Sequence, residues 1–191
     1  MPQRSYALQT DVGPSRQADL DDIARIGYGI LSEPFQLANA AGTTIIATGG
    51  LYLVGIPLLD GDKVSGIASS VSVVGAAQTT LFAGLYDQKG TLLGTSADVK
   101  ADFATGAVNK ISALTSVVSI TRSGLYYAAI CGVGGTQPTL VRGNATIPAL
   151  DSISPAALGN PRAAFMAGQT TLPATATFTN AGSIGLWLAA V

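Results

Sequence analysis

From residue 43 onward, short runs of β-branched and aromatic residues alternate with clusters of Gly, Pro, Ser and Asp. Such runs predict β-strands, because branched and aromatic side chains fit a pleated, half-buried surface and the clusters favour turns. Many short strands separated by turn residues are typical of two antiparallel sheets packed face to face. The sequence therefore predicts an all-β fold, an antiparallel β-sandwich.

The expected strands are 43–48, 51–56, 64–74, 79–86, 91–94, 107–114, 117–120, 124–131, 139–142, 163–166, 175–179 and 183–190. Alternation within the third strand predicts that Val71 and Val73 share one face. Asp87-Gln88-Lys89-Gly90 predicts a four-residue hairpin loop in which Gly90 takes positive φ.

Four other segments carry local signals. Residues 97–105 lack alternation and predict a helical turn or loop, and the glycine-rich stretch 132–135 predicts a hairpin. The proline-punctuated stretch 143–161 predicts a long excursion from the sheets. The apolar end of the chain, 185–191, is expected to be paired and buried, with Trp187 as a core or oligomer anchor rather than a sugar platform.

The composition changes near residue 34, which predicts two regions: residues 1–33, an attachment arm, and residues 34–191, the β-sandwich domain. The first 33 residues carry eight of the 21 charges. Residues 1–18 show no periodicity and predict an extended arm. From Asp19, apolar spacing and early carboxylates predict a short helix that needs a docking surface, either its own domain or a partner. The apolar side chains expected to make the attachment are Tyr6, Leu8, Val12, Leu20, Ile23 and Ile26.

Charge is scarce in this chain, at 11% of residues against 48% hydrophobic. An average soluble domain has about 25% charged residues. We therefore expect much of the surface to lie in contacts between subunits, and the alternative is a neutral monomer coated with Ser and Thr. Scattered Lys and Arg and a net charge of −1 argue against nucleic-acid binding.

The sequence favours no catalytic, metal or cofactor site. There is no histidine to activate Cys131 or a serine, and Cys131 lies in an apolar run typical of a buried thiol. The aspartates near residue 20 lack the spacing of a calcium loop, and the glycines at 132–135 lack the context of a dinucleotide loop. No apolar stretch is long enough for a membrane span, and Met1-Pro2-Gln3-Arg4 begins no visible signal peptide.

About half of the chain, residues 51–142, resembles a domain of tail-fibre, minor tail and other virion-surface proteins of phages that infect actinobacteria. The resemblance is carried by Leu51-Tyr52-Leu53-Val54, by Phe82-Ala83-Gly84-Leu85-Tyr86-Asp87 with Gly90-Thr91-Leu92-Leu93-Gly94, by Gly124-Leu125-Tyr126-Tyr127-Ala128-Ala129 and by Arg142-Gly143. It implies a sandwich of jelly-roll character, usually assembled as a trimer on the particle, and no catalytic residue.

The expected function is that of a non-enzymatic decoration or surface protein of the virion. Its expected partners are copies of itself and the major capsid or tail proteins, on the outer surface of capsid or tail. The arm is short and has no shaft repeat, which favours a decoration or surface protein over a fibre protein. The alternative is a receptor-binding head that recognises host glycan through loops such as 97–105 and 143–161. A third hypothesis, an enzyme that acts on polysaccharide, lacks support because the sequence shows no identifiable acid–base pair.

Overall fold

The computed structural model describes residues 30–31, 34, 42–143, 163–178 and 185–191. The chain divides into two units, residues 1–30 and 31–191, and the description below concerns the second. Its described residues form strands in two antiparallel sheets and a single four-residue helix, so the predicted all-β class is confirmed. The predicted arm and short helix lie outside the described residues, apart from residues 30 and 31.

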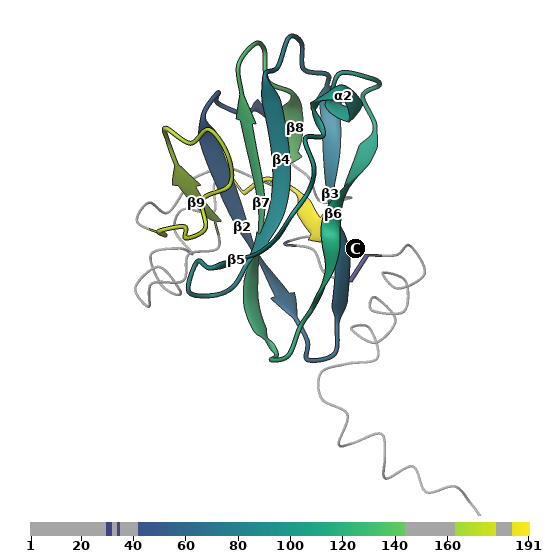
Figure 1. Cartoon of the computed structure of the whole chain (residues 1–191). Helices are drawn as coiled ribbons and strands as arrows, with labels where there is room; N and C mark the ends of the chain where they lie inside the picture. Colours follow the sequence, from purple (N-terminus) through teal and green to yellow (C-terminus); the bar gives the residue numbers. More distant parts are fainter. Residues whose placement is uncertain (1–29, 32–33, 35–41, 144–162, 179–184) are drawn as a thin grey trace, which may run out of the picture. The chain divides into compact units, whose positions relative to one another are not determined.

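The strands are β1 (Gly42–Ile45), β2 (Gly50–Leu58), β3 (Lys63–Val73), β4 (Thr80–Tyr86), β5 (Leu92–Thr95), β6 (Asn109–Ser119), β7 (Gly124–Val133), β8 (Thr139–Arg142), β9 (Ala163–Met166) and β10 (Leu188–Ala190), with helix α2 (Lys100–Phe103) between β5 and β6. Figure 1 shows α2 at one end of the strands.

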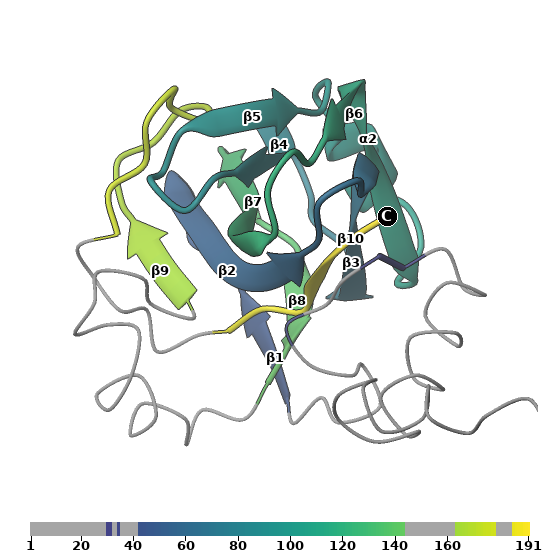
Figure 2. The same cartoon turned by 90° about the horizontal axis from the view of Figure 1, so that it is seen from below.

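The two sheets differ in which strands they contain. In the first sheet β1 pairs β8, β8 pairs β3, and β3 also pairs β6 and β10. The second sheet has the order β5-β4-β7-β2-β9. Up to β8 the chain crosses repeatedly between the sheets, and β4–β5 is the one pair of consecutive strands within a sheet. Figure 2 shows the two layers from below.

Two hydrophobic clusters lie on the two sides of the second sheet. The larger cluster fills the space between the sheets, with Val54 and Ile130 from one side and Ile67 and Leu140 from the other. The smaller cluster covers the opposite face of the second sheet and includes Tyr127. Burial on both faces explains why β2 and β7 are continuous apolar runs rather than alternating ones.

Residues 167–178, here called the covering segment, close the outer face of the second sheet. Gln169 N–H donates to Gly49 O at 2.9 Å, and Leu92 N–H donates to Ala174 O at 3.0 Å. Leu172 is buried in the smaller cluster. Figure 2 shows this yellow-green segment running outside the sheet from β9 towards β5. The predicted strand 175–179 is therefore wrong within the described residues: Thr175 makes a single bridge, to Thr91.

Several other details differ from prediction. The expected strands 107–114 and 117–120 form one strand, β6, with a register shift against β3. A bulge between Val71 and Val73 turns these side chains to opposite faces, so the prediction that they share one is wrong. The glycine-rich stretch 132–135 is not a hairpin, because β7 lies in the second sheet and β8 in the first.

The end of the chain is paired and buried, as predicted. Strand β10 pairs β3, and Val191 exchanges backbone hydrogen bonds of 3.1 Å with Gly66 in both directions. Leu31 N–H donates to Ala190 O at 2.8 Å, which places Leu31 in the same unit. Of the predicted strand 183–190, the described residues show a bridge at Leu186 and the strand β10.

Candidate interaction surface

The residues proposed for attachment, Tyr6, Leu8, Val12, Leu20, Ile23 and Ile26, lie outside the described residues. Trp187 is described and is only 2% exposed. Its neighbours Leu186 and Leu188 belong to the cluster between the sheets, whereas Trp187 belongs to neither cluster. Strand alternation accounts for this, because successive side chains point to opposite faces.

The outer face of the first sheet carries Ile45, Val73 and Ile111, three of the seven large exposed apolar side chains among the described residues. We call it the exposed face. Leu140 and Ile67 point into the core, so their strand neighbours and the residues opposite those neighbours point outward. The outward-pointing residues of the exposed face are Thr43, Ile45, Gly66, Ala68, Ser70, Val73, Asn109, Ile111, Ala113, Thr139, Val141 and Ala189. Of these, Gly66, Ala68 and Ala189 are buried.

Large apolar side chains stand in two rows on the exposed face. Ile45, Thr139 and Val73 lie directly opposite one another across three strands, and Ile45 and Val73 are 55% and 57% exposed. Ile111 is opposite Ala68 and is 64% exposed. Single exposed apolar side chains are common, but groups of them mark interaction surfaces.

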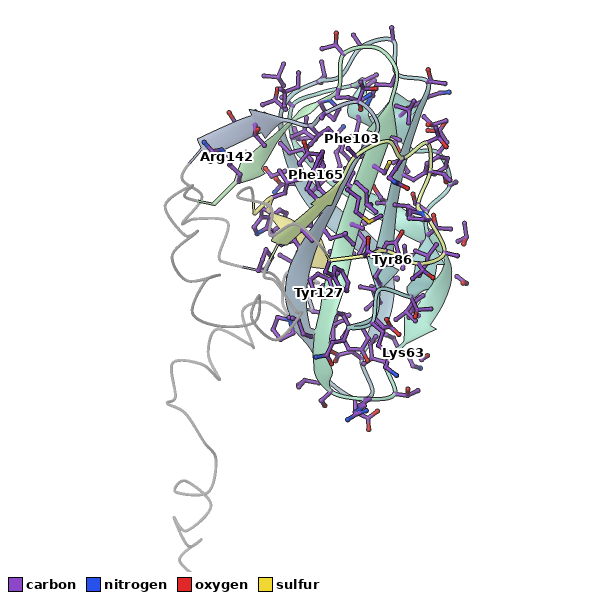
Figure 3. All side chains as sticks on the ribbon, turned by 90° about the vertical axis from the view of Figure 1, so that its left-hand side faces the viewer. Lys63, Tyr86, Phe103, Tyr127, Arg142 and Phe165 are labelled. Carbon is purple, nitrogen blue, oxygen red and sulfur yellow. The ribbon has the colours of Figure 1, made fainter. Side chains whose placement is uncertain are left out.

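The exposed face carries no ionisable side chain among the described residues. Lys63 begins β3 and Arg142 ends β8, so both lie at strand ends, and Figure 3 shows them far apart. Lys110 belongs to β6, but its position is opposite Ser69, whose strand position points inward, and its ammonium donates to Thr105 O. The surface is therefore neutral between its margins.

The outer faces of the two sheets differ in how much of their apolar surface is buried. Tyr86 and Tyr127, labelled in Figure 3, lie on the outer side of the second sheet and are fully buried. Tyr127 stacks on Phe178 of the covering segment with ring centroids 4.2 Å apart, and the Tyr86 hydroxyl donates to Pro173 O. The chain thus covers the outer face of the second sheet with its own residues. On the outer face of the first sheet Ile45, Val73 and Ile111 are exposed, whereas Ala68 and Ala189 are buried.

A recess of about 250 Å³ lies between the β4–β5 hairpin and the β6–β7 connection. Its lining residues are Asp87, Gln88, Lys89, Arg122, Ser123, Gly124, Leu125 and Tyr126. Three of their polar groups hold the loops themselves: Asp87 Oδ1 accepts from Lys89 N–H, Ser123 Oγ accepts from Asp60 N–H, and the Tyr126 hydroxyl donates to Arg122 O. This recess is not formed by either loop that the sequence suggested for glycan binding.

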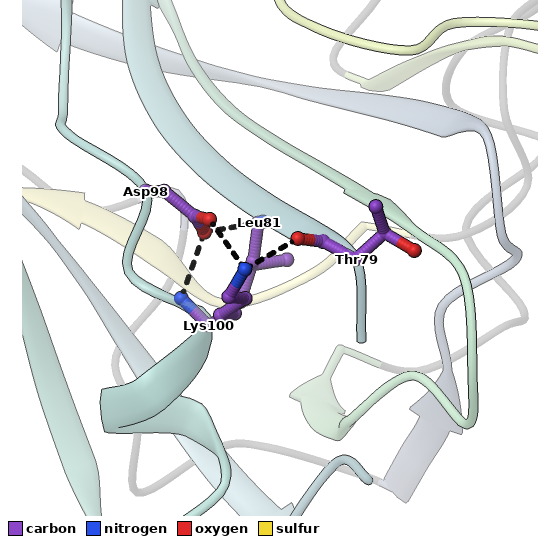
Figure 4. A network of polar contacts seen from close by, with 4 residues as sticks. All are labelled: Thr79, Leu81, Asp98 and Lys100. Atoms are coloured by element: carbon purple, nitrogen blue, oxygen red, sulfur yellow. Dashed lines mark hydrogen bonds and ion pairs between the residues drawn. The ribbon is translucent and has the colours of Figure 1, made fainter. Parts of the chain in front are cut away.

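Of those two loops, residues 97–105 are described and are tied to β4. Asp98 Oδ1 accepts from Leu81 N–H and Lys100 N–H, and the Lys100 ammonium pairs with Asp98 Oδ2 at 3.2 Å (Figure 4). The same ammonium donates to Thr79 O at 2.7 Å. Desolvation raises the pKa of Asp98, but these hydrogen bonds and the Lys100 charge outweigh it, so the pKa is lowered overall. The other loop lies outside the described residues, except Gly143.

The Cys131 thiol is buried in the smaller cluster, and desolvation raises its pKa to about 11. Burial likewise raises the pKa of Tyr86, and the nearby Cys131 adds to the shift. Among the described residues, no group of three or more acidic, cysteine or histidine side chains is placed to hold a metal ion. No helix in the described part of the chain is long and apolar enough to cross a membrane.

Sequence reasoning did not identify the exposed face. Its apolar positions are visible in the sequence, but the expected strands did not assign them to an inner or outer side. In comparisons with known proteins, the chain matches no protein-family model and no curated protein.

Proposed function

We propose that this protein is a non-enzymatic structural protein of a tailed-phage virion. In this proposal it is a trimeric decoration or surface protein on the outside of the capsid or tail. The domain is a jelly-roll sandwich, and residues 1–33 form the arm that grips capsid or tail subunits. The resemblance of residues 51–142 to virion-surface domains supports the setting, and the fold and surface support the mode of assembly.

Support for the jelly roll comes from the strand order. The first eight strands form two groups of four, β1-β8-β3-β6 and β2-β7-β4-β5. In each group the early strands lie beside the late ones, as expected when one long hairpin of antiparallel strands is wrapped into two facing sheets. Strands β9 and β10 then add to β2 and β3.

The observation that carries the proposal is the neutral exposed face on the first sheet. A protein that worked alone in water would gain solubility from charges there. A component of a regular shell instead needs surfaces that dock on other subunits without burying unpaired charge. The exposed face meets that requirement at Ile45, Val73 and Ile111.

The arm is tested by removing residues 1–18 and mixing the product with particles that lack the protein. We expect the truncated chain to fold and stay soluble but no longer to sediment with particles, because extended arms provide grip over a long footprint. In the full chain, replacing Tyr6, Leu8 and Val12 with Ser serves as a second variant. Full occupancy by both variants would show that the arm has no such role.

The recess beside the β4–β5 hairpin favours a second candidate, a receptor-binding head for host glycan. It combines the Tyr126 ring with the charged side chains of Asp87, Lys89 and Arg122 in a concave site. Binding of the purified protein to host cell-wall glycan, lost in Tyr126→Ala, would favour this candidate over a purely structural role.

A further inference from the structure

We infer that the exposed face is the surface through which copies of this chain pack on one another around the three-fold axis. The inference rests on the trimer of the proposed function and assigns that contact to one face. The occupant is therefore a second copy of the same chain, presenting the same or an adjoining part of this face.

The first argument is the distribution of exposed apolar side chains. Ile45, Val73 and Ile111 come from three strands and lie on one side of one sheet. The rows they belong to are five residues apart along β3, from Ala68 to Val73, or roughly 16 Å at the usual rise per residue. Val117, further along β6, is also more than half exposed, in the stretch where β6 shifts register against β3. The exposed apolar side chains are thus spread over several strands of this sheet rather than gathered at one point.

The second argument is charge. The described part of the exposed face holds no ionisable group between Lys63 and Arg142. A copy of the same chain brings the same neutral surface, so contact buries no charge without a partner. A different protein with an ordinary surface would bring about one charged residue in four, and each would lose water without gaining an opposite charge.

The third argument is the relief of the surface. Ile111 stands out beside Ala68 and Gly66, which are themselves buried, and a Cβ on Gly66 would lie 3.0 Å from the Ile111 side chain. The bulge in β3 turns Val73 outward beside Thr139. Ile111 and Val73 therefore stand as exposed ridges above smaller neighbours, and a second copy can pack against these ridges.

The fourth argument is the absence of an equivalent surface on the other sheet. The covering segment closes the outer face of the second sheet through Leu172, Ala176 and Phe178. Among the described residues, the large exposed apolar side chains outside the exposed face are Leu59 in a loop, Leu93 on β5, and Val108 and Val117 at or near the ends of β6.

The test compares Ile111→Asp with Leu59→Asp in the full chain, by mass in solution from light scattering. Both wild-type side chains are 64% exposed, so the variants change exposed apolar surface equally. We expect a trimer for the wild type and for Leu59→Asp, and single chains for Ile111→Asp. A trimer for Ile111→Asp would overturn the assigned face and leave the proposed function standing. Single chains for the wild type would overturn the proposed trimer, and this inference with it.

A second measurement covers the case in which Ile111→Asp fails to fold. Ile111→Cys and Leu59→Cys each add one accessible thiol, while Cys131 is buried. We expect maleimide to label the thiol at position 111 at least about tenfold more slowly than that at position 59, because reactivity depends on access. The difference should vanish on dilution to single chains. Equal rates in the trimer would overturn the inference, and so would protection that persists in the single chain.

Discussion

At the scale of single residues, Cys131 shows how burial sets chemical behaviour. Its thiol lies in the smaller cluster, with Gln169 O of the covering segment 3.9 Å away, and desolvation raises its pKa to about 11. Because the thiolate is the reactive form, we expect maleimide near neutral pH to leave the folded protein unlabelled and to label the chain in concentrated guanidinium rapidly. Mass spectrometry after timed quenching measures this. Equal labelling rates in the two states would contradict the buried position.

Asp98 is the residue whose titration should affect stability. Its pKa is lowered in the folded state, so its contribution is fully present above the pKa of the unfolded chain, near 4, and is lost as pH falls through the folded value. We expect Asp98→Ala to cost about 1–2 kcal/mol at neutral pH, because two backbone N–H groups lose their acceptor.

Urea unfolding of the wild type and of Asp98→Ala, at neutral pH and in acid, measures this effect. The gap between the two proteins should narrow as Asp98 of the wild type becomes protonated. Asp98→Asn is the matched control, since its amide oxygen can still accept from Leu81 N–H. A gap that stays constant into strong acid would contradict the role of the charged carboxylate.

At the scale of elements, the β4–β5 hairpin and the covering segment hold each other in place. Gly90 has φ +84°, its carbonyl accepts from Ala176 N–H at 2.7 Å, and a Cβ there would overlap the Ala176 carbonyl oxygen. Gly61 has a similar φ of +94° with open space around it. Comparing the same substitution at the two glycines therefore distinguishes the cost of backbone strain from the cost of steric overlap.

We expect Gly90→Ala to lower the free energy of unfolding by about 3 kcal/mol or more, and Gly61→Ala by about 1–2 kcal/mol. Both substitutions place an alanine in a left-handed backbone conformation, which is unfavourable, but Gly90→Ala also forces the covering segment away from the hairpin. Urea unfolding gives the two energies, and faster maleimide labelling of Cys131 in Gly90→Ala reports the displaced segment. Equal energies would mean that this contact adds no stability.

At the scale of the whole molecule, the proposed assembly depends on a modest free energy per copy. A fully buried Ile or Val side chain contributes about 1.5–3 kcal/mol, so three that are half exposed have roughly 2–5 kcal/mol left to gain. Association costs at least about 4 kcal/mol in lost freedom of motion. These three side chains alone do not hold a tight trimer, and the small neighbours must pack as well. In the proposed function, the proposed arm and the proposed contact through the exposed face are therefore both expected to contribute to retention on a particle. The variants in residues 1–18 and the variant at Ile111 test the two contributions separately.

Features that depend on neighbours in the sequence could be predicted from the sequence. The β4–β5 hairpin is one, because Asp87 Oδ1 accepts from Lys89 N–H and Thr91 N–H, and Gly90 takes the positive φ that a side chain would resist. Most of the strands, the turn at 97–105 and the buried chain end are others. Each follows from backbone preferences and side-chain patterns over a few residues.

Features that depend on distant segments were decided only by the tertiary structure. The stretch 175–178 has the composition of a strand, yet it covers a sheet because the outer face of β4 and β7 is apolar. The bulge at Val73 forms where β3 meets β8, about seventy residues further along the chain. Which side of the first sheet stays exposed depends on where the second sheet packs. Strand alternation divides the residues into two faces but does not show which face is buried. Local sequence determined most of the strands and turns. Long-range packing decided the exceptions, such as 175–178, and which apolar faces the strands bury.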